Sequence, residues 1–134
     1  IAGDGCFRMY MNEIATATRS EIPVIEVVVN NHVLGMVRQW QNLFYGERYS
    51  STTLYDKVDF VKLAEAMGAK AKRVETIEEF EAAFKEAVAS NEPYLLDCII
   101  DSDDKVWPMV APGGSISDAF NEEDLEKQKQ EESK

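Results

Sequence analysis

The sequence predicts an α/β fold in which a doubly wound, mostly parallel sheet carries helices on both of its faces. Almost continuously apolar, β-branched stretches alternate along the chain with stretches whose apolar residues recur at helical spacing. A strand buried on both faces has such a composition, and the alternation of strand and helix is typical of parallel sheets. No internal repeat in the sequence suggests a different architecture.

The first part of the chain is expected to supply two strands. Residues 1–2 have the character of the end of a buried strand that runs into a turn at residues 3–5, so most of this first strand is expected to be missing. Apolar residues at helical spacing predict a helix over residues 9–19. The β-branched run over residues 24–29 predicts a second strand, which ends on Asn30-Asn31.

Two helices are expected to follow this strand. The first covers residues 33–44 and leads into a polar connection over residues 46–57. Asp59 has the residue type and position of an N-cap for the second helix, over residues 60–67, which stops at Gly68.

The alternation of strand and helix is then expected to repeat. A short strand over residues 71–74 leads to Thr76 and Glu79, which have the spacing of a capping box at a helix start. A strand over residues 94–100 completes the sheet. The predicted apolar face of the intervening helix consists of Phe80, Ala83, Phe84 and Ala87.

The end of the chain divides into an apolar loop and a charged tail. Residues 107–114 are too apolar for a free linker and too rich in proline and glycine for a helix, so we expect a packed loop. From Asn121 onward nearly every residue is charged or carries an amide, which is typical of a solvated helix or of disorder. We therefore expect a domain over residues 1–120 and a tail over residues 121–134.

Charge and cysteine content bear on the partners of the chain. The 25 acidic and 14 basic residues give a net charge of -11, which repels nucleic-acid phosphates and anionic membrane surfaces. No apolar run reaches the roughly 18 residues that a membrane-spanning helix needs. Cys6 and Cys98 are far apart, which disfavours a disulfide scaffold. These observations predict a cytoplasmic protein that binds neither nucleic acid nor membrane.

Two loops that follow predicted strands carry oxygen ligands. Asp4 lies in the loop Gly3-Asp4-Gly5-Cys6, and Asn31 lies in the next such loop, beyond the 24 residues from 6 to 29. That interval holds one helix and one strand, so neighbouring parallel strands would bring both side chains to one cation. Mg²⁺ takes such ligands together with phosphate oxygens, which indicates a metal-diphosphate site. Taken singly, each loop is more simply a tight turn.

The pair formed by Gly3-Asp4-Gly5 and Asn30-Asn31 resembles the diphosphate-binding motif of thiamine-diphosphate enzymes, which begins Gly-Asp-Gly and closes with Asn-Asn. Further stretches resemble the large catalytic subunit of acetolactate synthase, also called acetohydroxyacid synthase, in its C-terminal thiamine-diphosphate-binding domain. This resemblance covers roughly residues 1–120. The further matching stretches are residues 35–41, Phe44-Tyr45, residues 59–68 and residues 108–110.

The resemblance implies a role for each matching residue. It implies that Asp4 and Asn31 bind Mg²⁺ through their side chains and Val33 through its backbone carbonyl, so that the metal anchors the diphosphate. It also implies that Trp40 narrows the substrate pocket, whereas helical spacing alone would place this tryptophan in the core. The residues implied to line the cofactor, besides the two metal-binding side chains, are Gly3, Gly5, Cys6, Gly35 and Met36.

Members of this family decarboxylate pyruvate on thiamine diphosphate and condense the product with pyruvate or 2-oxobutyrate in branched-chain amino acid biosynthesis. Their activating glutamate and most of their FAD site lie on other domains, which do not fit in 134 residues. The resemblance therefore implies a truncated chain without a catalytic residue, inactive alone, with 2-oxoacid substrates, homo-oligomeric partners and a possible regulatory small subunit. Two alternatives stay open: another thiamine-diphosphate decarboxylase or carboligase, which residues 35–41 disfavour, and a non-catalytic cofactor-binding module.

Overall fold

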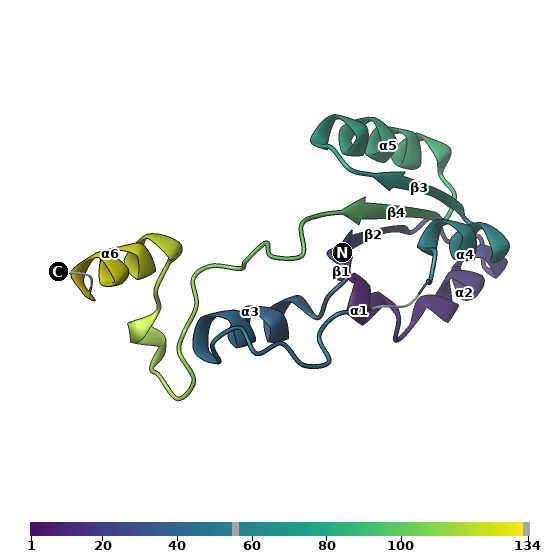
Figure 1. Cartoon of the computed structure of the whole chain (residues 1–134). Coiled ribbons are helices and arrows are strands. Elements are labelled where there is room, and N and C mark those ends of the chain that lie inside the picture. Colours follow the sequence, from purple (N-terminus) through teal and green to yellow (C-terminus); the bar gives the residue numbers. More distant parts are fainter. Residues whose placement is uncertain (55–56, 133–134) are drawn as a thin grey trace.

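Four parallel strands form one sheet, in the order β1-β2-β4-β3 (Figure 1). The computed structural model describes residues 1–54 and 57–132. The strands are β1 (Ala2–Gly3), β2 (Ile25–Asn30), β3 (Lys70–Val74) and β4 (Tyr94–Ile99). The predicted parallel sheet is confirmed, and β4, the last strand in sequence, lies between β2 and β3.

Helices connect these strands and lie on both sides of the sheet (Figure 1). The α-helices are α1 (Asp4–Phe7), α2 (Ile14–Arg19), α3 (Gly35–Phe44), α4 (Phe60–Ala66), α5 (Ile77–Ser90) and α6 (Glu122–Glu132). Two short 3-10 helices, η1 (Met11–Glu13) and η2 (Ile116–Asp118), complete the described elements.

The core consists of two clusters, one on each face of the sheet. Successive residues of a strand point to opposite faces, so Leu95 and Leu96 of β4 enter different clusters. Both leucines are fully buried, and burial of one such side chain contributes about 1.5–3 kcal/mol. The first cluster consists of Phe7, Val28, Phe60, Ala64, Ala69 and Leu95. The second consists of Val27, Val74, Ala83, Ala87, Tyr94 and Leu96.

Side chains that cap the helix N-termini fix the starts of α4 and α5 where the sequence predicts them. The Asp59 carboxylate accepts a hydrogen bond from the backbone N–H of Lys62 at 3.3 Å, which confirms the N-cap. The side chains of Thr76 and Glu79 form the predicted capping box. The predicted apolar face of α5 is only partly correct, because Phe84 is exposed.

Several predicted boundaries are wrong at one end. Residues 3–5 are not a free turn, since α1 already begins at Asp4. The helix predicted over residues 9–19 begins only with η1, because Tyr10 has a non-helical φ of -139°. The helix predicted from residue 33 begins at Gly35, because Val33 forms an antiparallel bridge with Thr53.

The polar connection predicted over residues 46–57 is described up to residue 54 and at residue 57. Its residues 55 and 56 lie outside the described residues. In the described part, the backbone N–H of Leu54 donates to the carbonyl of His32, and the N–H of Leu34 donates to the carbonyl of Thr52. The connection therefore supports the segment between β2 and α3.

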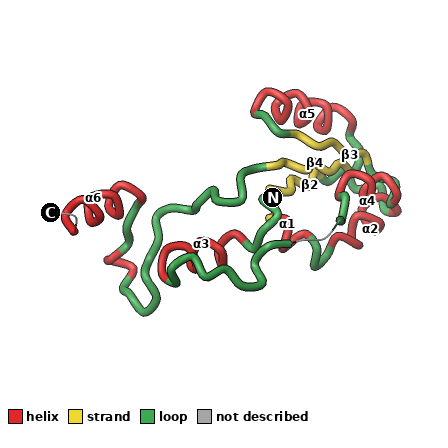
Figure 2. Tube along the Cα trace, in the orientation of Figure 1, coloured by secondary structure: helices red, strands yellow, loops and turns green. Residues whose placement is uncertain are grey.

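Beyond β4 the chain leaves the sheet and runs alongside α3 toward α6 (Figure 2). The Gln39 side chain donates to the carbonyl of Val106 at 2.9 Å and accepts from its N–H at 3.0 Å. Arg38 forms a two-bond ion pair with Asp103. Met109 is buried and pairs with Phe120, but residues 111–114 are exposed, so the packed loop predicted over residues 107–114 is only partly correct.

The tail expected to be a solvated helix or disordered contains α6, and residues 133–134 lie outside the described residues. In the described part of the chain, no helix combines the length and the apolar character needed to cross a bilayer.

Tyr94 ties β4 to α5 and gives the fold a testable pH dependence. Its buried hydroxyl donates to Glu86 at 3.0 Å, and burial together with this hydrogen bond raises the pKa of Tyr94 to about 12. An unfolded tyrosine loses its proton near pH 10. Between these values the folded chain holds more protons than the unfolded chain, so this contribution to stability is complete below about pH 10 and is lost as the pH rises to about 12.

Denaturant unfolding measured at several pH values between about 9 and 12 checks this expectation. Tyr94→Phe is the control, since it removes the hydroxyl while lysine side chains still titrate. The free energy of unfolding of the wild type should fall more steeply with pH than that of the variant, and equal slopes would contradict the assignment to Tyr94.

Candidate cofactor and metal site

The two loops singled out by the sequence meet at the carboxyl ends of β1 and β2. The two strands pair in parallel with Gly3 opposite Val29, so Asp4, the first residue of α1, and Asn31 directly follow neighbouring strands. The loops are in close contact, because a Cβ added at Gly5 would lie 2.8 Å from Leu34 Cδ2. The structure thus brings the predicted loops together.

Asp4 is the most unusual side chain of this region. It is only 2% exposed, and its Oδ2 atom is buried without a hydrogen-bond partner. Burial raises the pKa of Asp4, although the backbone N–H of Gly5 and the charges of Arg8 and His32 act in the opposite direction. A buried carboxylate oxygen without a partner is unfavourable, and a cation would stabilise it. Asp4 therefore has the environment of a metal ligand.

Asn31 is held in place by the turn that leads into α3. Its Oδ1 accepts a hydrogen bond from the N–H of Val33 at 3.2 Å, which leaves this amide oxygen a second lone pair for a cation. A Cβ added at Gly35 would lie 2.8 Å from Asn31 Nδ2. Glycine at position 35 therefore leaves the space that the Asn31 side chain occupies.

The ligands offered here suit magnesium. Asp4 contributes a carboxylate, Asn31 an amide oxygen and Val33 a backbone carbonyl, which are hard ligands, and Mg²⁺ completes its shell with phosphate oxygens and water. Among the described residues, no three histidine, cysteine, aspartate or glutamate side chains form a metal-binding group. The first N–H groups of α3, from Gly35, lack intrahelical acceptors and favour an anion. These residues therefore fit magnesium and a diphosphate.

The other candidate residues lie around this centre with different exposure. Gly3, Cys6 and Met36 are exposed, and Cys6 is a free thiol. Trp40 is half-buried and packs edge-to-face on Phe44, with 5.8 Å between ring centroids. The indole also lines a hollow of about 350 Å³ beside α3, together with Val37, Gln41, Tyr45 and Arg48. We refer to these five residues as the α3 hollow.

Sequence reasoning missed a polar network below the Asn31 loop. Asn30 Nδ2 donates to Asp97 Oδ1 at 2.8 Å, and Arg73 Nε donates to Asp97 Oδ2 at 3.0 Å. Asn30 and Asp97 are both buried. The available signal was a single aspartate within the otherwise apolar strand predicted over residues 94–100.

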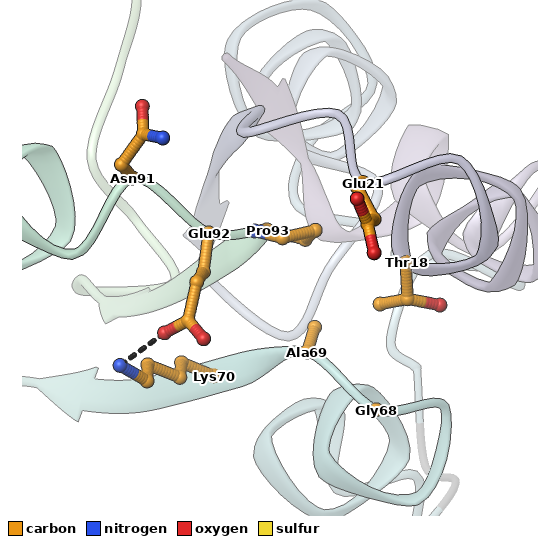
Figure 3. Close-up of a pocket in the computed structure, with 8 residues that line it drawn as sticks. All are labelled: Thr18, Glu21, Gly68, Ala69, Lys70, Asn91, Glu92 and Pro93. Atoms are coloured by element: carbon orange, nitrogen blue, oxygen red, sulfur yellow. Dashed lines mark ion pairs between the residues drawn. The ribbon is translucent and has the colours of Figure 1, made fainter.

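A cavity of about 480 Å³ lies at the opposite end of the sheet from the Asp4 and Asn31 loops, where β3 and β4 begin (Figure 3). Thr18, Gly68 and Asn91 contribute to its lining from the ends of α2, α4 and α5, and an ion pair joins Lys70 to Glu92 across it. Ligands of open parallel sheets bind at the carboxyl ends of the strands. This cavity is therefore separate from the Asp4 and Asn31 loops.

Sequence comparison identifies a family whose model matches the chain and several similar proteins. Residues 1–98 match the family described as "Thiamine pyrophosphate enzyme, C-terminal TPP binding domain". The chain is 50% identical to a probable acetolactate synthase large subunit of Methanocaldococcus jannaschii, over 87% of this chain and 20% of that protein. It is 46% identical to the acetolactate synthase isozyme 2 large subunit of Escherichia coli, over 88% of this chain and 22% of that protein. The chain thus spans about a fifth of the length of these relatives.

Structural comparison supports the same family. Benzoylformate decarboxylase from Polynucleobacter necessarius matches with a TM-score of 0.70 and 28% identity, over 78% of this chain and 20% of that chain. A thiamine diphosphate-dependent 4-hydroxybenzoylformate decarboxylase of Rhodococcus jostii matches with a TM-score of 0.67 and 28% identity, over 77% and 19%. The chain therefore belongs to the C-terminal TPP-binding domain family of thiamine pyrophosphate enzymes, and its relatives at 45–50% identity are acetolactate synthase large subunits.

Proposed function

We propose that the chain is the thiamine-diphosphate and magnesium binding part of an acetolactate synthase catalytic subunit. The whole enzyme would decarboxylate pyruvate and condense the product with pyruvate or 2-oxobutyrate. The observation that carries the binding role is the buried, unpartnered Oδ2 of Asp4, in a loop that contacts the Asn31 loop. The higher identity to acetolactate synthases than to the two decarboxylases favours this reaction.

In this proposal the side chains of Asp4 and Asn31 and the carbonyl of Val33 hold Mg²⁺. Thiamine diphosphate supplies an electron sink for decarboxylation when it is bound. The protein groups orient the diphosphate, and the exposed start of α3 offers N–H donors to it. The proposed lining residues are Gly3, Gly5, Cys6, Gly35 and Met36.

Trp40 is proposed to shape the pocket that receives the 2-oxoacid. The α3 hollow is lined by aromatic and apolar groups and by the guanidinium of Arg48, which suits a small molecule with a carboxylate. Another thiamine-diphosphate decarboxylase is the second candidate, because both solved structures compared above are decarboxylases and the one from Rhodococcus jostii is thiamine diphosphate-dependent.

The chain covers about a fifth of the length of its relatives, and turnover is proposed to require the other parts of the subunit. The activating glutamate and most of the FAD site would lie there, and a homo-oligomer and a regulatory small subunit would be the partners of a cytoplasmic enzyme. Met36 and Val37 of α3 are about half exposed, which supports contact between this helix and another domain or subunit.

Calorimetric titration of thiamine diphosphate into the purified chain, with Mg²⁺ and with EDTA, tests the binding role. We expect saturable binding that depends on Mg²⁺, because the ligands described above reach the diphosphate through the metal. A colorimetric acetoin assay of the same preparation should show no acetolactate. Metal-independent binding would contradict the ligand assignment, and acetolactate formation would contradict the need for other domains.

A further inference from the structure

A line of polar contacts crosses the sheet from β3 through β4 to β2. Asp97 of β4 is fully buried, and its two carboxylate oxygens have different partners, Asn30 on one side and Arg73 on the other. Arg73 also donates to Asp59, the N-cap of α4, at 3.2 Å. The line therefore joins the start of α4 to the last residue of β2.

The contact with Asn30 extends into the loop that carries Asn31. While its Nδ2 donates to Asp97, the Oδ1 of Asn30 accepts a hydrogen bond from the backbone N–H of His32 at 3.2 Å. His32 adopts a left-handed φ of 58°, which is unfavourable for a residue with a Cβ unless its surroundings enforce it. The bond from His32 to Asn30 is one such constraint.

The acceptor on Asp97 fixes the orientation of the Asn30 amide. If this amide turned over, its NH₂ group would face the N–H of His32 and its oxygen would face the Asp97 carboxylate, so both hydrogen bonds would be lost. Asp97 thus determines which atom of Asn30 faces the loop. Arg73 neutralises the buried carboxylate and holds its other oxygen.

We propose that Asp97 is a positioning residue for the metal loop, acting through Asn30 and His32 on the place of Asn31. The inference rests on the proposed function, in which Asn31 is a metal ligand. The pair of Asp97 with Arg73 is only partly buried, since the Arg73 side chain is 44% exposed, and such a pair is weak evidence for a role in stability. Its use here is to fix one conformation of the loop, as outer partners of metal ligands do in other sites.

Asp97→Asn is the main test, measured in two ways on the whole chain. With thiamine diphosphate at a fixed concentration, we expect the Mg²⁺ concentration for half-maximal binding to rise about tenfold. Without metal or cofactor, we expect the His32 amide hydrogen to exchange with solvent at least about tenfold faster by NMR, because its acceptor is no longer held. Asn30→Ala, which removes that acceptor itself, should show the same two changes and serves if Asp97→Asn does not fold.

Asp59→Asn is the matched control. It removes the charge that faces Arg73 at the other end of the line, while asparagine still serves as an N-cap for α4. We expect a lower melting temperature with unchanged Mg²⁺ dependence and unchanged exchange at His32. If Asp59→Asn changed the Mg²⁺ dependence and the exchange at His32 as much as Asp97→Asn does, a general loss of stability would explain both, and the proposal would be overturned.

Wild-type exchange at His32 in both Asp97→Asn and Asn30→Ala would also overturn it. The exchange measurement needs no ligand, so it separates this proposal from the proposed function. If the wild-type chain binds no thiamine diphosphate at any Mg²⁺ concentration, the binding role fails, and faster exchange confined to the His32 loop still supports positioning by Asp97.

Discussion

Asp4→Asn is expected to abolish Mg²⁺-dependent binding of thiamine diphosphate and to stabilise the metal-free chain. The asparagine keeps the size of the side chain and loses the charge that a cation needs. Outer partners of metal ligands are typically worth about 10- to 100-fold in affinity, so loss of a direct carboxylate ligand should cost at least about 100-fold. Calorimetry under the conditions used for the wild type measures the loss.

The gain in stability follows from the burial of Asp4. Its Oδ2 is buried without a partner, and an unpaired buried charge costs more free energy than the neutral amide that replaces it. Burial raises the pKa of Asp4 in the folded chain above the ordinary value of 3.8. At pH values between 3.8 and the raised pKa, the folded chain therefore holds more protons than the unfolded chain. Stability therefore falls as the pH rises through this window, and the cost is complete above the raised pKa.

Urea unfolding of the metal-free wild type and variant at about pH 4 and pH 7 checks the sign. The advantage of Asp4→Asn should be larger at pH 7, where Asp4 is charged. The exposed Asp104 gives the control, since Asp104→Asn should change neither stability nor binding. An Asp4→Asn chain that is less stable than the wild type at pH 7 would show that the carboxylate is satisfied without metal.

Gly35→Ala is expected to weaken magnesium-dependent binding by about 10- to 100-fold without unfolding the chain. The new methyl group would lie 2.8 Å from Asn31 Nδ2, so the Asn31 side chain must leave its place. The fold tolerates this movement because only the end of a side chain shifts, and alanine favours a helix by about 1 kcal/mol over glycine. Binding falls because the displaced amide is the proposed ligand.

Gly46→Ala is the matched control for this substitution. Gly46 has a left-handed φ of 59° and no heavy atom within 4 Å of an added Cβ, so alanine strains only the backbone there, by about 1 kcal/mol. We expect a lower melting temperature and unchanged binding. If Gly35→Ala bound the cofactor as tightly as the wild type, Asn31 would not be a ligand in this loop conformation.

The sequence predicted those parts of the fold that depend on neighbouring residues. The caps at Asp59 and Thr76 involve backbone groups within three residues, so residue type and spacing were sufficient. The start of α3 was predicted too early because it depends on Thr53, a partner 20 residues from Val33 that no local pattern reveals.

The candidate site was predictable to a similar extent. The neighbouring placement of the Asp4 and Asn31 loops followed from parallel strands joined by one helix. The contact between Asn30 and Asp97 was not predictable, because it requires β4 beside β2 in a register that sets Asp97 opposite Val28.

The strand order has a consequence for how the chain folds as it is synthesised. Both β2 and β3 pair with β4, which begins only at Tyr94, whereas β1 pairs with β2 through two residues. A nascent chain that ends before Tyr94 therefore carries the ligand loops but lacks the strand that joins the halves of the sheet. Because the N-terminus leaves the ribosome first, the Asp4 and Asn31 loops emerge before the strand that completes the sheet. The apolar strands β2 and β3 must therefore stay apart from other chains until β4 pairs between them.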